Sequence, residues 1–116
     1  MKLKDQIVEL ELSKQLKKAD YPQDGLWWWI NYQGVIRILH PDFVGIKICV
    51  APTLAELIDK LPEWIKNDCY FLSIDKNSIE YRHHADSEKC WCACDGKFLQ
   101  DALARMWLYL KKEGLI

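Results

Sequence analysis

The sequence predicts an α+β domain, in which an antiparallel sheet packs against an N-terminal helix, a short central helix and a long C-terminal helix. Three observations support this prediction. Apolar residues recur at helical spacing near both ends of the chain. A capping signal marks a helix start in the centre, and short apolar runs between turn residues indicate strands. Because 116 residues is the size of one ordinary domain, we expect residues 1–116 to form a single domain.

The first expected helix covers residues 4–19. Its apolar side chains recur at four-residue steps, and two lysines at its C-terminal end suit the helix dipole. Tyr21-Pro22 ends this helix, because the residue before a proline is driven out of the helical region. Two extended segments follow, residues 26–32 and 35–40. They flank Gln33-Gly34, a pair that suits a tight hairpin turn.

A third extended segment is expected over residues 45–50, and the clearest helix start follows it. In APTLAELIDKLPE, Thr53 can accept a hydrogen bond from the third amide of the helix while Glu56 reaches back, which is the capping-box arrangement. The apolar stripe that follows has the steps of three and four residues that a helix needs to bury one face. Pro62 ends this short helix.

The segment from residue 70 to residue 94 predicts a three-stranded meander, with turns at Lys76-Asn77 and at residues 85–87. The expected cross-strand pairs are Ile74 with Ile79, Leu72 with Tyr81, Tyr70 with His83, His83 with Cys90, Tyr81 with Cys92, and Ile79 with Cys94. One face of the meander then holds most of the apolar side chains and three thiols. The opposite face is mostly polar and is expected to be solvated.

The closing segment GKFLQDALARMWLYLKKEG predicts the long C-terminal helix. Six apolar residues form one stripe: Leu99, Ala102, Leu103, Met106, Trp107 and Leu110. Asp101 precedes Arg105 by four residues, which favours an ion pair between them. Gly114 suits the residue just after the helix.

Charge and composition argue against several classes of function. Sixteen basic and seventeen acidic residues are mixed along the chain, so the concentrated basic face of a duplex-binding protein is not expected. No apolar run approaches the roughly 18 residues of a membrane span, and the N-terminus lacks the pattern of a signal peptide. We therefore expect a cytoplasmic protein with no membrane partner, whose five cysteines are reduced thiols.

The segment HHADSEKCWCAC holds two histidines and three cysteines within twelve residues. His83, Cys90 and Cys92 are weak candidates for zinc ligands, because C-x-C along a flat strand separates the sulfurs by about 7 Å. We instead expect the cysteines of this segment to be small apolar side chains in the core, with no metal and no cofactor. Glycine-rich nucleotide loops and other catalytic motifs are absent from the sequence, and no catalytic residue is assigned.

Trp27, Trp28 and Trp29 stand side by side in the first extended segment. Because neighbouring side chains of a strand point to opposite faces, the three indoles need two separate covers. Helices can supply both covers, which is the ordinary interpretation for large aromatic residues. Alternatively, one face is a binding platform for a partner protein or a flat ligand, or it is covered by a second copy of the chain.

Several stretches of the chain resemble small proteins encoded by bacterial phages and prophages. The resemblance rests on LSKQLKKADYPQ, the following tryptophan-containing run, APTLAELIDKLP, the YFLSI and EYR strands, and DALARMWLYL. It implies a protein that acts in the cytoplasm of a bacterial host, and it supplies no catalytic residue. Residues 31–50 and 83–94 are outside it.

These observations favour a non-catalytic accessory protein of the phage type that binds an unidentified host or viral protein. One alternative is a small-ligand protein with a nucleotide-like pocket, or a small enzyme with His83 and Cys90 as its reactive pair. Another is a structural homodimer, and a homo-oligomer stays open.

Overall fold

The computed structural model describes residues 3–75, 78–86, 89–96 and 98–116. It confirms the α+β class, with three helices and two antiparallel sheets. In chain order the elements are η1 (Leu3–Asp5), α1 (Leu10–Lys18), β1 (Trp28–Tyr32), β2 (Val35–Leu39), β3 (Ile46–Val50), α2 (Leu54–Lys60), β4 (Trp64–Ile65), β5 (Tyr70–Ile74), β6 (Ser78–His83), β7 (Cys90–Asp95) and α3 (Leu99–Lys112).

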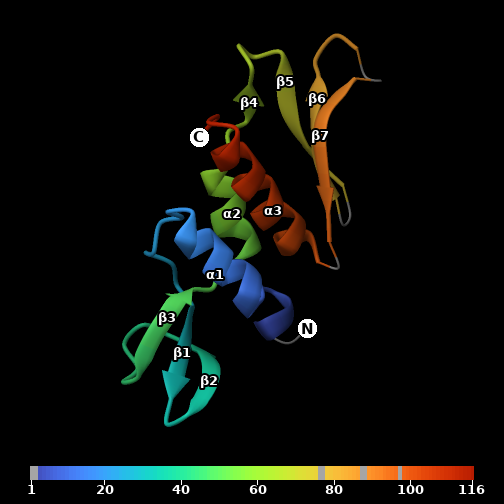
Figure 1. Ribbon diagram of the computed structural model, residues 1–116. Coiled ribbons are helices and arrows are strands. Elements are labelled where there is room, and N and C mark those ends of the chain that lie inside the picture. Colours follow the sequence, from blue (N-terminus) through green and yellow to red (C-terminus); the bar gives the residue numbers. More distant parts are fainter. Residues whose placement is uncertain (1–2, 76–77, 87–88, 97) are drawn as a thin grey trace.

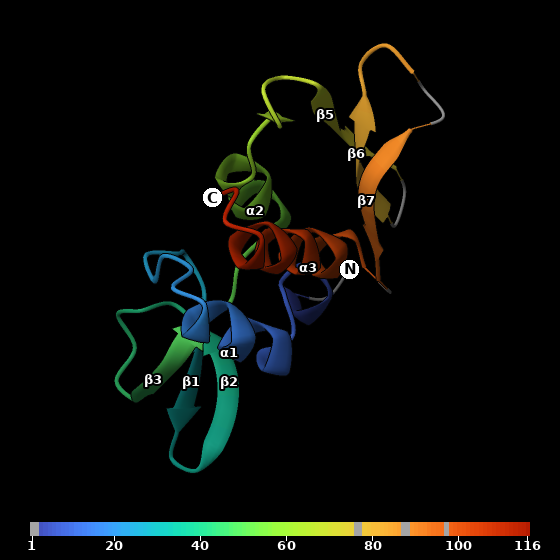
Figure 2. The ribbon, with the colours of Figure 1, turned by 45° about the horizontal axis from the view of Figure 1, so that its top comes forward.

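The helices lie in the middle of the molecule, between the two sheets (Figure 1). The sheet β2-β1-β3 projects from one end, and the sheet β4-β5-β6-β7 lies at the other, with β6 and β7 beside α3 (Figures 1 and 2). The Cα atoms span 54 × 29 × 18 Å, so the molecule is elongated.

The first helix is shorter than the sequence predicts. Residues 4–19 were expected to be helical, but η1 is a single 3-10 turn and α1 begins only at Leu10. The residues between them bind the segment that precedes α2: Ile7 forms a bridge with Thr53, and the Val8 N–H donates to the Pro52 carbonyl at 2.9 Å. Ile7 and Val8 are buried there, so tertiary contacts replace the expected first turns of the helix.

The predicted hairpin is present as β1 and β2. Gln33 and Gly34 both have positive φ values, of 53° and 84°, as a two-residue type I′ turn requires. Strand β3 pairs with the other edge of β1, so the chain from β2 must cross the sheet before β3 begins. Gly45 ends this crossing so close to β1 that a Cβ there would lie 2.6 Å from Cγ2 of Ile30, which is fully buried.

The capping box of α2 is confirmed. The Thr53 hydroxyl accepts from the Glu56 N–H at 3.2 Å, and the Glu56 carboxylate accepts from the Thr53 N–H at 3.0 Å. These two bonds satisfy backbone donors that the first turn of a helix leaves without a partner.

Replacing Thr53 with alanine is expected to lower the free energy of unfolding by about 1 kcal/mol, because one of those donors loses its acceptor. Urea denaturation followed by circular dichroism measures this loss. Thr53→Ser is the matched control, since serine keeps the accepting oxygen. Equal stability of the alanine and serine variants would contradict the role of the cap.

The predicted meander is present, and the register between β5 and β6 is as predicted, with Ile74 opposite Ile79, Leu72 opposite Tyr81 and Tyr70 opposite His83. The turn predicted at Lys76-Asn77 lies outside the described residues, as does Ser87 of the second turn. Strand β4 is an addition that the sequence pattern does not indicate; it pairs with β5 after Pro62.

The predicted register between β6 and β7 is right in one half and wrong in the other. Tyr81 lies opposite Cys92 and Ile79 opposite Cys94, but Cys90 lies opposite Arg82 instead of His83. The shift is a β-bulge at Trp91, which re-aims this side chain from the expected polar face to α3. Its ring centroid lies 5.2 Å from that of Tyr109 on α3, so the packing of this half-buried indole on α3 accounts for the bulge.

Helix α3 occupies the centre of the core and contacts α1, α2, β6 and β7. Its predicted apolar stripe is buried from Ala102 to Leu110. The predicted ion pair between Asp101 and Arg105 is not formed, because Arg105 instead donates to the Asp95 carbonyl at 2.9 Å. Burial raises the pKa of Asp101, with a further contribution from the charge of Glu9. The helix ends at Lys112, and Gly114, with a φ of 74°, allows the Leu115 N–H to donate to the Leu110 carbonyl.

Candidate functional site

The three tryptophans lie in three different environments. Trp28 packs against the core and carries the Lys47 ammonium 5.3 Å from its ring centroid. Trp29 is the next residue of β1, and its indole N–H donates to the Val8 carbonyl at 3.2 Å. Trp27 precedes the strand and lines a pocket beside the first turns of α2 and α3. All three are half-buried, so they do not form one shared platform.

His83 and Cys90 are not brought together as a reactive pair. The His83 Nδ1 accepts from the Ala85 and Asp86 N–H groups, at 3.1 and 3.2 Å, and thereby holds the turn that follows β6. The ring also stands 5.2 Å from Tyr70 and 4.9 Å from His84, measured between centroids. These contacts give His83 a structural role at this end of the sheet.

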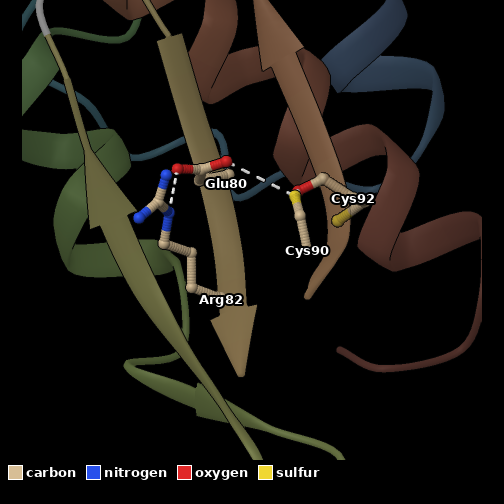
Figure 3. A network of polar contacts seen from close by, with 4 residues as sticks. All are labelled: Glu80, Arg82, Cys90 and Cys92. Atoms are coloured by element: carbon tan, nitrogen blue, oxygen red, sulfur yellow. Dashed lines mark hydrogen bonds and ion pairs between the residues drawn. The ribbon is translucent and has the colours of Figure 1, made fainter. Parts of the chain in front are cut away.

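The exposed Cys90 belongs to a small polar network on the face of the sheet (Figure 3). Its Sγ lies 3.4 Å from a Glu80 carboxylate oxygen, while the other oxygen of Glu80 accepts from Arg82. Partial burial, together with the hydrogen bond to Glu80 and the charge of that carboxylate, raises the pKa of Cys90. Because the thiolate is the nucleophile, this environment disfavours cysteine chemistry at Cys90.

The two following cysteines face the core. Cys92 and Cys94 pack against it, and the Cys92 Sγ lies 3.4 Å from the Met106 Sδ on α3. Burial raises the pKa of Cys92 to about 12, and it also raises that of Cys94. Among the described residues, no group of three histidine, cysteine or acidic side chains is placed to hold a metal ion. Cys92 and Cys94 contribute to the packing around the core.

The projecting sheet β2-β1-β3 exposes apolar side chains that the sequence interpretation did not single out. Exposed large apolar residues in and around it are Leu26, Tyr32, Val35, Ile36, Phe43, Val44 and Ile46. Asn31 lies opposite both Ile36 and Ile46, so these two isoleucines flank it on one face. Val44 and Ile46 are 83% and 72% exposed. Five of these residues, Tyr32, Val35, Ile36, Val44 and Ile46, lie around the β1–β2 turn at the free end of the sheet, and we call them the sheet tip.

The opposite face of this sheet carries two cations in addition to the exposed Tyr32 and Val35. Arg37 and Lys47 lie opposite Ile30 on the two neighbouring strands, so both cations share the face that the chain crosses between β2 and β3. The outer edge of β2 has no neighbouring strand within the described residues. The sequence of β2, VIRIL, is apolar except for Arg37, and such a run is typical of a covered strand, which is why the sequence alone did not reveal the exposure.

No helix in the described part of the chain is both long and apolar enough to cross a membrane. Comparisons with models of protein families, with curated proteins and with solved structures found no match to this chain.

Proposed function

We propose that this chain is a non-catalytic accessory protein of the phage type, which binds a host or viral protein through the sheet tip. The main support is the concentration of exposed apolar side chains on residues 32–46. Soluble proteins rarely expose large contiguous apolar patches, and those that do commonly use them to bind a partner. The resemblance of the sequence to phage and prophage proteins supports the phage origin.

The geometry of the tip suits a protein partner. It combines Ile36 and Ile46 on one face with the outer edge of β2, which can accept the backbone of an extended segment. The raised pKa values of Cys90 and Cys92 leave these thiols protonated at neutral pH, so the reactive pair considered from the sequence gains no support.

Photo-crosslinking tests this proposal directly. p-Benzoylphenylalanine placed at Val44 is expected to crosslink the protein to a partner in bacterial host cells, because this residue is 83% exposed at the tip. The matched control carries the same group at Glu113, an exposed position at the end of α3. A partner found at both positions, or at neither, would contradict the proposal, and a product of two copies of this chain would favour the homodimer.

With the crosslinked partner purified, Ile46→Lys is expected to weaken binding about tenfold or more, since it places a charge in the centre of the apolar contact. Isothermal titration calorimetry measures the affinity. The melting temperature should not change, because Ile46 is 72% exposed. Unchanged affinity would place the binding surface elsewhere.

A further inference from the structure

A pocket of about 470 Å³ lies where η1 and Trp27 meet the first turns of α2 and α3. Its volume is within the range of small-molecule sites. Its walls are mostly apolar, and they include Leu3, Trp27, Leu54, Phe98 and Leu99. The pocket shares no lining residue with the sheet tip, so the two surfaces can be tested separately.

Gln100 gives the pocket a fixed polar group. Only 5% of this side chain is exposed, and its Nε2 donates to the Asp5 carbonyl at 2.6 Å and to the Ile7 carbonyl at 3.4 Å. Because a carbonyl oxygen only accepts hydrogen bonds, these two contacts fix which end of the amide carries the nitrogen. The Nε2 of Gln100 is thus occupied, and its Oε1 is the atom that can accept a hydrogen bond from a bound molecule.

Asp5 also lines the pocket, and a carboxylate only accepts hydrogen bonds. An occupant that satisfies these groups must bring N–H donors. The apolar walls and the indole of Trp27 favour a flat ring, because aromatic rings bury a large apolar area against one another. The chemistry of the lining thus favours a ring with a donor at its edge and disfavours an anionic group beside Asp5.

The walls are held in place without an occupant. The Val8 N–H donates to the Pro52 carbonyl, Ile7 bridges Thr53, and the capping box fixes the first turn of α2. Gln100 ties η1 to α3. A pocket that is already formed saves the ordering cost of binding, which makes affinity for a small molecule attainable.

We propose that this pocket binds a planar heteroaromatic molecule, with its ring against Trp27 and its N–H group donating to the Oε1 of Gln100. The inference does not depend on the proposed function, since a protein that binds a partner through the sheet tip can hold a small ligand here.

Indole and benzofuran form a matched pair of probes, because benzofuran has the same shape but an oxygen in place of the N–H. We expect indole to bind with a Kd of about 1 mM or lower, as small fragments do, and to shift amide resonances of the pocket residues in NMR spectra. Benzofuran is expected to bind about fivefold more weakly, which corresponds to the loss of one hydrogen bond.

Two variants locate the site. Ala55→Trp adds an indole at an exposed position on the pocket lining and should abolish indole binding, whereas Ile58→Trp, at another exposed position of α2, should preserve it. Melting temperatures confirm that both variants fold. Equal affinity for the two probes, shifts outside the pocket, or binding that survives Ala55→Trp would each overturn the inference, as would the absence of any shift.

Discussion

Replacing Leu103 with alanine is expected to lower the free energy of unfolding by about 3 kcal/mol, because the truncation leaves a cavity in a fully buried part of the core. Leu103 belongs to the buried stripe of α3, the helix that contacts α1, α2, β6 and β7. Because these four elements surround α3, the neighbouring side chains can fill the cavity only in part. The loss then includes both the transfer free energy and the cavity contribution.

Urea denaturation followed by tryptophan fluorescence measures this loss as a shift in the midpoint at constant slope. Leu26→Ala is the matched control, since Leu26 is 52% exposed and the same truncation there is expected to change stability by about 0.5 kcal/mol or less. If the two variants lost the same stability, α3 would not have the central place in the core that we assign to it.

Raising the pH above 10 is expected to destabilise the fold steeply. Tyr21 and Tyr81 are both buried, and burial raises the pKa of each above the ordinary value of 10.0. Above pH 10 the unfolded chain releases these protons while the folded protein retains them, so stability falls as the pH rises. Each tyrosine contributes about 1.4 kcal/mol for every pH unit in this window. Thiols with raised pKa values, such as that of the half-buried Cys92, add to the loss from about pH 9.

Urea midpoints measured from pH 8 to pH 12 test this prediction. Tyr81→Phe should flatten the alkaline slope by about half of the tyrosine contribution. The same variant should cost about 1–3 kcal/mol at neutral pH, because the Tyr81 hydroxyl donates to the Pro62 carbonyl at 2.6 Å. Tyr32→Phe, at an exposed position of β1, is the control. An alkaline slope that is the same in wild type and Tyr81→Phe would contradict the prediction.

The parts of the fold that depend on local signals could be predicted from the sequence. The capping box at Thr53 and the apolar stripe of α3 each contain, within one helix, the information that determines the helix. The register between β5 and β6 follows from side-chain alternation, because a slip by one residue would turn Ile79 and Tyr81 away from the core.

The parts that depend on distant contacts could not be predicted. Residues 6–9 have a helical pattern, but they are not helical, because Ile7 and Val8 pair with Thr53 and Pro52. The bulge at Trp91 exists because this indole packs on α3, which no pattern in β7 indicates. Alternation placed Trp28 and Trp29 on opposite faces, yet it could not reveal that the exposed apolar residues lie further along the same sheet.

The position of the two sheets at opposite ends of the helices affects how the protein behaves in solution. Its Cα radius of gyration is 15.3 Å, whereas a compact chain of this length has about 13 Å. Such a particle diffuses more slowly than a sphere of equal mass, so a monomer will elute early in gel filtration and will resemble a larger species. Multi-angle light scattering, which yields molar mass independently of shape, is therefore the appropriate way to distinguish one copy from two.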